Sequence, residues 1–454
     1  MGACLVAACC HRIDPGGAEA SVLRLSQNDR VLVLAPHPDD EVLCCGGLLQ
    51  RAVERQLPIR VVFLTLGDSN EWSFLAYRKR PTLTGGQARA MGRLRAEEAL
   101  EAAERLGVAP EAVSFLCYPD HRGLALFLRA WGDRSPVRGR LTRARAVPYE
   151  RALRTGAPHR GEEVLEDLGW LLSEFRPTRI FVSHPADHHA DHEAFYLFTM
   201  VALWEARGEI SASVHPYLIH YPAWSLPTGH QPQLGLSPPA QLHATRRWHT
   251  FPLSEAEIAG KRHALEAHRT QFGYSARRLL RFVRANELFA ELVPARAGPA
   301  AVVQDDDEGG PEVALEAPEL VPAEALEDFF DVERWSLRDE GDHVEVTIEL
   351  DRALRSSQRV SLHVLGARED RPFAEMPKIE VRVWQDRFHT LERGRRERRA
   401  AVELTRRGRQ LVLRVPMAVL GDPHRLLVGV RGSSRAVPLD RVPWRIVELA
   451  SGES

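Results

Sequence analysis

The chain has 454 residues, 44% of them hydrophobic, and a formal net charge of −2 at pH 7. The length suggests two or three domains, and the near-zero charge argues against a nucleic-acid-binding protein, which needs a marked positive charge. No apolar run approaches the length of a transmembrane segment. The six cysteines follow neither zinc-finger spacing nor a disulfide framework, so we expect a reducing, cytoplasmic location.

Residues 1–29 precede the first predicted strand, and we interpret them as an N-terminal extension. Within them, VAAC (6–9) has the small-residue form of a lipoprotein cleavage site. A basic start and a proper apolar stretch are missing in front of it. A lipid-anchored or exported protein is therefore the alternative to a cytoplasmic one.

Strand and helix patterns alternate along the first part of the chain. Strands are predicted at residues 30–36, 59–67, 113–120, 179–185 and 216–224. Helices are predicted at residues 46–56, 87–107, 164–175, 191–206 and 255–271. The last helix begins with a capping box formed by Ser254 and Glu257. This alternation is typical of a mainly parallel, Rossmann-like sheet with helices on both faces, and we expect this α/β domain to span residues 30–294.

The chain changes character after this domain. Ten acidic and no basic residues lie between residues 305 and 328, which predicts a solvated acidic linker at 295–328. Hydrophobicity then alternates with period two, as in strands. These strands are predicted at residues 344–350, 360–365, 378–384, 410–416, 425–430 and 444–449. We expect a smaller all-β sandwich domain at 329–454, where no metal or nucleophile signature is found.

Two clusters of imidazole and carboxylate groups follow predicted parallel strands. The first is PHPDDE (36–41), and the second lies within HPADHHADH (184–192). In an open parallel sheet, ligands bind beyond the carboxyl ends of the strands, so the two clusters are expected to meet there. Taken alone, the first cluster could be a helix cap and the second a surface metal trap. Their joint position at the ends of two strands favours a true metal site.

Imidazole and carboxylate ligands suit Zn²⁺, and Fe²⁺ would fit the same set. A catalytic zinc ion keeps three protein ligands and one position for water, whose pKa it lowers. A neighbouring carboxylate that is not a ligand can then accept the proton of that water. Of the adjacent Asp39 and Asp40, one can bind the metal while the other faces the water.

PHPDDE followed by GG, and the later HHADH, resemble the signature motifs of the LmbE-like or PIG-L family of zinc-dependent N-acetylglucosaminyl deacetylases. Further similar segments are RAEE (95–98), YPD (118–120), KRHALEAHRTQF (261–272) and FVRANELF (282–289). The likeness covers roughly residues 30–290 and does not reach the β-rich part. Ala190 departs from the family pattern, which often has proline there.

The resemblance implies a role for each matching residue. The zinc ligands of the family correspond to His37, Asp40 and His192. Asp39 corresponds to the general base, and His189 to the proton donor or oxyanion partner. Asp191 would orient the imidazole of His189. The implied reaction releases acetate from an N-acetylglucosamine-type sugar or sugar conjugate.

Several more residues are candidate substrate contacts. Asp68, Arg95 and Asp120 could bind sugar hydroxyls, with ordinary surface ion pairs as the alternative. His268 lies one helical turn before Gln271, so both could face the site, with polar support of the core as the alternative.

Two further segments could lie near the substrate. Residues 129–160 carry nine arginines against two acidic residues. We interpret them as a flexible solvated insert, with contact to a phosphate or an anionic glycan as the alternative. Trp72, Phe74 and Tyr77 could stack on a sugar ring or pack a loop against the core.

The main hypothesis is therefore a zinc-dependent N-deacetylase acting on a small amino-sugar substrate. The first alternative is a catalytically silent carbohydrate-binding protein on the same fold. The second is an amidase acting on a different amide, such as a thiol conjugate, because the metal chemistry is shared. The sequence indicates neither the identity of the sugar nor an oligomeric state.

Overall fold

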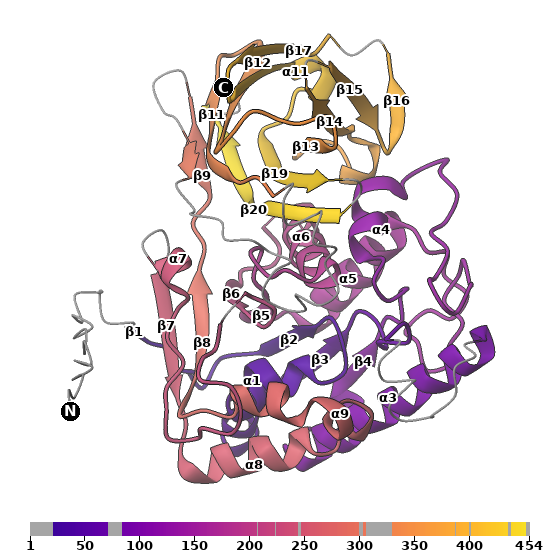
Figure 1. The fold of residues 1–454 in the computed structure, drawn as a ribbon. Coiled ribbons are helices and arrows are strands. Elements are labelled where there is room, and N and C mark those ends of the chain that lie inside the picture. The colour runs from indigo at the N-terminus through magenta and orange to yellow at the C-terminus, as the bar shows by residue number, and fades with distance from the viewer. Residues whose placement is uncertain are drawn as a thin grey trace, which may run out of the picture.

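The computed structural model describes residues 21–70, 84–206, 208–222, 224–243, 247–298, 303–305, 329–385, 387–398, 401–434 and 437–450. These residues form a mixed α/β structure in which a parallel sheet is followed along the chain by two β-rich sheets (Figure 1). Several features predicted from the sequence lie outside the described residues: VAAC (6–9), residues 306–328 of the acidic linker, and the aromatic residues Trp72, Phe74 and Tyr77.

The parallel sheet has five strands in the order β4-β3-β2-β5-β6. They are β2 (Val31–Ala35), β3 (Ile59–Phe63), β4 (Val113–Phe115), β5 (Arg179–Ser183) and β6 (Ser213–Tyr217). All four neighbouring pairs are parallel, which confirms the mainly parallel prediction. The chain moves outward from β2 to β4 and then returns to the other side of β2. The loops after β2 and β5 therefore face one crevice, which is the usual ligand site of such sheets.

Helices cover both faces of this sheet (Figure 1). On one side lie α1 (Asp40–Glu54), α3 (Gly85–Arg105), α8 (Glu255–Leu265) and α9 (Arg269–Leu279). On the other lie α4 (Gly123–Arg129), α5 (Gly161–Phe175) and α6 (Ala190–Glu205). The central residues of α6, AFYLFTMVAL (194–203), include only two side chains with a polar group, the hydroxyls of Tyr196 and Thr199. Such a helix is typical of a buried position, and α6 lies between the parallel sheet and the C-terminal sheets.

The predicted single helix at 255–271 is wrong, although its capping box at Ser254 and Glu257 is confirmed. The helix ends at Leu265, and α9 begins at Arg269. His268 between them has non-helical torsion angles because its imidazole turns inward and contacts Glu41 at 2.8 Å. A tertiary contact thus overrides the local helix propensity.

A small sheet flanks this half of the molecule. It joins β1 (Ser21–Val22), β7 (Arg247–Pro252) and β8 (Asn286–Glu291), and the short helix α7 (Ala240–His243) precedes β7. Residues 21–29 of the predicted extension are therefore part of the folded structure, and Leu23, Leu25 and Asp29 among them are buried.

The C-terminal part forms two mainly antiparallel sheets with the orders β10-β11-β12-β18-β17 and β16-β15-β14-β13-β19-β20-β9. Their strands are β9 (Ala295–Ala297), β10 (Val303–Asp305), β11 (Val332–Asp339), β12 (His343–Leu350), β13 (Gln358–Ala367), β14 (Lys378–Trp384), β15 (Arg387–Glu392), β16 (Arg395–Glu397), β17 (Glu403–Arg407), β18 (Gln410–Pro416), β19 (Arg425–Ser434) and β20 (Val437–Leu449). A short helix, α11 (Met417–Leu420), follows β18.

One hydrophobic cluster draws side chains from both C-terminal sheets, including Ile348 and Val428. Burial alternates along β12, as the period-two pattern predicts. The strands β9 and β10 fall in the segment assigned to the linker, so the described part of 295–305 belongs to these sheets. A sandwich type of fold and the domain limits 30–294 and 329–454 stay predictions.

The arginine-rich segment 129–160 is not the flexible solvated insert that we expected. Trp131, Val147 and Tyr149 are buried within it. Arg154 forms ion pairs with Glu163, Glu166 and Asp167 of α5. Apolar anchors and ion pairs thus fix the segment against the domain. Among the described residues, none of the helices is both long and apolar enough to cross a membrane.

The two glycines after the first motif allow helix α8 to pack against α1. A Cβ on Gly46 would lie 2.9 Å from Cγ of Lys261, and one on Gly47 would lie 2.3 Å from Leu253. The close approach buries an ion pair between Lys261 and Glu287 at 2.7 Å. Glu287 also accepts hydrogen bonds from the backbone N–H groups of Gly47 and Leu48. The same contacts therefore fix the helix that begins with the first motif.

We predict that Lys261→Met lowers the free energy of unfolding by about 3–5 kcal/mol, because it leaves the buried Glu287 charge without its partner. The matched control is Arg262→Met, which breaks a pair with Glu266 at the surface and should change stability by at most about 0.5 kcal/mol. Denaturant unfolding of both variants provides the measurement. An equal loss of unfolding free energy in the two variants would show that the buried pair stabilises the protein no more than the surface pair does.

Candidate metal centre and active site

The first motif spans the end of β2 and the start of α1. The helix begins at Asp40, earlier than the predicted residue 46. Asp40 and Glu41 occupy its first turn, where carboxylates are favoured by the helix dipole. Asp39 is the N-cap residue and has φ 115°, a strained conformation for a residue with a side chain. The strand therefore ends in a turn that presents three successive acidic side chains.

The second motif spans the end of β5 and the start of α6. His189 is the N-cap residue of α6, and its Nδ1 accepts a hydrogen bond from the backbone N–H of Asp191. His192 lies in the first turn of the helix and is fully buried. Because β2 and β5 are neighbours, this turn faces the first motif.

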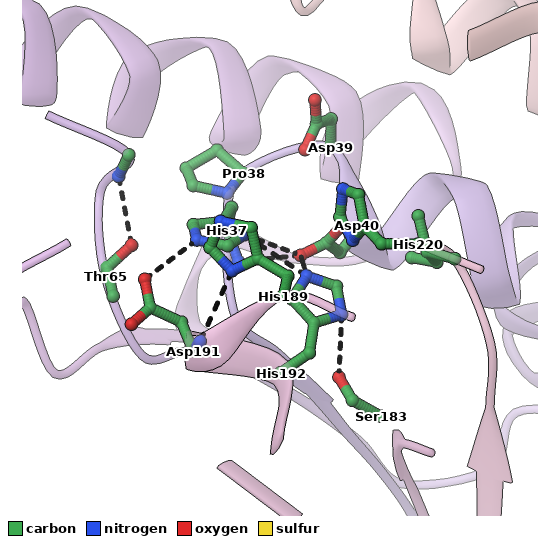
Figure 2. Close-up of polar contacts among 12 residues, drawn as sticks. His37, Pro38, Asp39, Asp40, Thr65, Ser183, His189, Asp191, His192 and His220 are labelled. Carbon is green, nitrogen blue, oxygen red and sulfur yellow. Dashed lines mark hydrogen bonds and ion pairs between the residues drawn. The ribbon is translucent and has the colours of Figure 1, made fainter. Parts of the chain in front are cut away.

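His37, Asp40 and His192 come together as predicted ligands should (Figure 2). Nδ1 of His37 lies 3.2 Å from Oδ2 of Asp40 and 3.3 Å from Nε2 of His192. The remaining distance, from His192 Nε2 to Asp40 Oδ2, is 3.1 Å. Ligand atoms about 2.0–2.1 Å from a tetrahedral zinc ion lie about 3.3 Å from one another. The donor types and their spacing therefore fit one zinc-like ion, and the assignment of the three ligands stays a prediction.

Three further carboxylates hold the outer nitrogens of the two imidazoles. Asp120 and Asp191 each lie 3.2 Å from Nε2 of His37. Asp187 lies 3.2 Å from Nδ1 of His192. Carboxylates in these positions orient metal-binding histidines and fix their tautomers.

Asp191 does not have the contact that we predicted. Its carboxylate contacts His37 and accepts hydrogen bonds from the backbone N–H groups of His121 and Gly123. Only its backbone N–H meets the ring of His189 (Figure 2). Its place in the first turn of α6 directs the carboxylate toward the first motif, so the predicted orientation of His189 by this side chain is wrong.

Burial and charge act in opposite directions on the triad. Burial alone would lower the pKa of His37, but Asp120, Asp191 and Asp40 raise it well above its usual value. Burial also opposes the charged form of His192, but Asp187 and Asp40 raise its pKa to about 9. The imidazole of His192 in turn holds the pKa values of Asp40 and Asp187 well below their usual range, against the effect of burial. Without metal, both imidazoles are therefore in the charged imidazolium form at pH 7.

Asp39 lies beside the triad in a different environment. Burial raises the pKa of its carboxyl to about 7, although Arg95 acts to lower it. Nη2 of Arg95 lies 3.7 Å from Asp39 and donates a hydrogen bond to the carbonyl of Pro38. The backbone N–H of Asp39 donates to Glu41. Asp39 is thus held next to the ligands without sharing their contacts, and it can exchange a proton near neutral pH.

His189 lines the same cavity as Asp39. Burial and the neighbouring imidazoles lower the pKa of His189 well below its usual value, so the ring is neutral. Since its Nδ1 accepts a hydrogen bond, the proton of the neutral ring belongs on Nε2. His189 can therefore act as a hydrogen-bond donor.

A cavity of about 440 Å³ opens over these groups, within the range of small-molecule sites. Its lining residues include His37, Asp39, Asp40, Ser69, Asn70, Arg95, Asp120, His121, Arg140, His189, His220, Gln271, Tyr274, Arg278 and Arg281. Arg95 and Asp120, two predicted substrate contacts, are among them. So are Gln271 and, from the arginine-rich segment, Arg140.

Asp68 and His268 are not among the residues that line the cavity, and their role as substrate contacts stays a prediction. Asp68 is buried and accepts a hydrogen bond from the hydroxyl of Tyr149 at 2.5 Å. Burial and the nearby Asp120 raise the pKa of Asp68 to about 7. His268 is fully buried against Glu41. Both residues support the site from behind.

The sequence analysis missed three site residues. His220 follows β6, lines the cavity and lies 3.3 Å from Asp187. His121 directly follows Asp120, and its ring centroid is 4.8 Å from that of His189. Asp187 lies within the second motif, but the sequence analysis gives it no role. The rule that sites lie beyond the carboxyl ends of strands would have singled out His121 and His220, because they follow β4 and β6.

Residues 32–203, which contain both motifs, match the family described as "PIG-L: GlcNAc-PI de-N-acetylase". The match spans this segment alone, which is less than half of the chain. Two curated relatives are 1D-myo-inositol 2-acetamido-2-deoxy-α-D-glucopyranoside deacetylases. That of Saccharopolyspora erythraea is 31% identical over 185 residues, which are 40% of this chain and 55% of the relative. That of Corynebacterium glutamicum is 28% identical over 181 residues, 39% of this chain and 54% of the relative.

The chain thus spans about half the length of the curated relatives it matches. Among solved structures, the N,N'-diacetylchitobiose deacetylase of Pyrococcus horikoshii is 17% identical, with a TM-score of 0.37. That likeness covers 57% of this chain and 82% of the other. The PIG-L match ends at residue 203, before the C-terminal sheets begin.

Zinc binding is expected to release about two protons at pH 7, because His37 and His192 must lose theirs before they can bind a metal. Apparent zinc affinity should therefore rise with pH up to about 9. Calorimetric titration in buffers of different ionisation enthalpy measures the number of protons. His188→Ala is the control, since burial lowers the pKa of His188 to about 3 and its ring is uncharged at pH 7, with no proton to release. Zinc binding without proton release would contradict the prediction.

Proposed function

We propose that this protein is a zinc-dependent N-deacetylase that hydrolyses the acetamide of an N-acetylglucosamine-type sugar or sugar conjugate. The PIG-L match and the two curated relatives support this reaction class. The observation that carries the proposal is local. Asp39 and His189 line one cavity together with His37 and Asp40, and the buried His192 lies behind these two ligands, 3.1 Å from Asp40 and 3.3 Å from His37. This arrangement provides a metal site, a proton acceptor and a hydrogen-bond donor within reach of one small ligand.

The metal would be held by Nδ1 of His37, an oxygen of Asp40 and Nε2 of His192. Zn²⁺ bound there would supply a positive charge that lowers the pKa of nearby water and polarises the amide carbonyl. Fe²⁺ suits the same donor set. Asp120, Asp191 and Asp187 hold the outer nitrogens of the two rings and keep the inner ones aimed at a common point.

Asp39 would accept the proton of the attacking water, because its carboxyl lies in the cavity and has a pKa of about 7. The water oxygen then bonds to the amide carbon, and negative charge develops on the carbonyl oxygen. His189 would donate a hydrogen bond from Nε2 to that oxygen. As the carbon–nitrogen bond breaks, the proton held by Asp39 passes to the departing nitrogen. The products are acetate and the free amine.

Arg95 and Asp120 are proposed to orient the substrate from the same cavity. Arg95 already donates hydrogen bonds to the carbonyls of Gly67 and Pro38, so its position is fixed before a ligand arrives. Asp120 accepts a hydrogen bond from the backbone N–H of Ser69 and contacts His37. A fixed cation and carboxylate reduce the ordering needed when a sugar binds.

The test of the proposed function is acetate release from a panel of N-acetylated compounds. We expect zinc-loaded protein to release acetate from N-acetylglucosamine or its inositol conjugate, and chelation followed by zinc addition to abolish and restore the activity. The panel includes N-acylated thiol conjugates. Release only from those would favour the alternative amidase. Binding of the sugars without acetate release would favour the silent carbohydrate-binding protein and refute the proposal.

Asp39→Asn is predicted to lower kcat by about 10²–10⁴-fold while leaving zinc affinity within a few-fold of wild type, because the amide keeps the shape but cannot accept the proton. Zinc content and acetate release are measured on the same preparation. Asp40→Asn is the matched variant, and it should lose zinc as well as activity. A fully active Asp39→Asn protein would exclude Asp39 as the base.

A further inference from the structure

We propose that Glu193 and the three C-terminal residues that hold it, Arg431, Arg441 and Trp444, position the metal ligand His192. The β-rich part of the chain would then belong to the scaffold of the active site rather than being an accessory to it. This inference rests on the proposed function, and three of its four residues lie outside the PIG-L match, which ends at residue 203.

Glu193 directly follows His192 in the first turn of α6 and is only 1% exposed. Its Oε1 forms an ion pair with Arg441, and its Oε2 with Arg431. Oε2 also accepts a hydrogen bond from the indole N–H of Trp444 at 2.9 Å. A buried carboxylate is unfavourable unless it is paired and hydrogen-bonded, so these contacts determine where Glu193 can lie.

The C-terminal sheet is arranged to receive one negative charge at this point. Arg431 of β19 and Arg441 of β20 are directly opposite each other in the strand register. Like charges in such positions repel unless a counter-ion lies between them. Trp444 packs against Gly429, where a Cβ would lie 3.0 Å from the indole ring. The sheet therefore offers two guanidinium groups and an indole N–H to a single carboxylate.

The position of Glu193 is transmitted to the metal site through one helical turn. Its backbone N–H donates to the carbonyl of His189, at 3.1 Å. This turn also contains Asp191 and His192. A displacement of Glu193 would therefore move a predicted metal ligand, the carboxylate that holds His37, and the proposed oxyanion donor. Catalytic groups must be held within about 0.5 Å, and a misplacement of about 1 Å can reduce the rate by about 100-fold.

The other end of α6 provides a matched control. Glu205, the last residue of the helix, accepts a hydrogen bond from the backbone N–H of Phe373 at 2.7 Å. Phe373 stacks on Phe127, with ring centroids 5.5 Å apart, and thus anchors the same C-terminal sheets. Glu205 therefore also joins α6 to the C-terminal part, but it lies several turns away from His192.

The experiment compares Glu193→Gln with Glu205→Gln in the full chain. Zinc affinity is measured on metal-free protein by competition with a chromogenic chelator, and kcat and KM by acetate release. We expect Glu193→Gln to weaken zinc binding by about tenfold and to lower kcat by about tenfold, while KM stays within about twofold of wild type. A tenfold loss is at the lower end of what is seen when a partner of a metal ligand is removed. Glu205→Gln should leave all three within about twofold, whatever its melting temperature.

Trp444→Phe keeps an aromatic side chain and both ion pairs, and it removes the hydrogen bond to Glu193 together with part of the buried indole. Trp444→Phe should weaken zinc binding by about threefold. If Glu193→Gln does not fold, the zinc affinity of Trp444→Phe is compared with that of Glu205→Gln instead. The inference is overturned if the folded variants at Glu193 and Trp444 bind zinc as wild type does, or if Glu205→Gln loses as much. Wild-type protein that binds zinc but hydrolyses no amide would refute the proposed function alone, because the zinc affinities still test the positioning role.

Discussion

Buried negative charge is the constraint on which this site depends. Asp40, Asp120, Asp187 and Asp191 lie within the protein and surround the two imidazoles of His37 and His192. Ionised carboxylates cannot be buried together without compensating positive charge. Two imidazolium protons supply part of this positive charge in the metal-free protein, and a divalent cation would replace them at equal charge. The carboxylates thus make the crevice attractive to a cation, and the geometry of the inner nitrogens decides where the cation would bind.

The adjacent residues Asp39 and Asp40 show how local structure separates two chemically identical groups. Asp40, inside the first turn of α1, contacts both imidazoles, which hold its pKa well below the usual range against burial. Asp39, at the strained N-cap position, lacks those contacts, and burial raises its pKa to about 7. One carboxylate is therefore suited to permanent ionisation as a ligand and the other to proton transfer. A difference of this kind is the usual sign of divided roles in a catalytic pair.

The central part of the site could be predicted because it depends on short-range order. His37, Asp40 and His192 each follow a strand that the hydrophobic pattern reveals, and adjacent parallel strands bring their ends together. The partners of these residues could not be predicted. Which carboxylate meets which imidazole depends on side-chain direction across more than 150 residues, as for His37 and Asp191. His268 shows the same limit, since its contact with Glu41 breaks a helix that local propensity would continue.

The composition of α6 contained a signal that the sequence analysis did not use. A helix that packs against one sheet needs one apolar face, whereas α6 is buried on nearly all sides. Such a helix needs a second layer, and the C-terminal sheets provide it (Figure 1). Once α6 is enclosed in this way, Glu193 can reach no water and must find its partners within the protein. Arg431 and Arg441 face the converse problem, because two opposed guanidinium groups need an anion. The carboxylate of Glu193 in α6 and the two guanidinium groups of the C-terminal sheet thus neutralise one another, at the helical turn that carries His192.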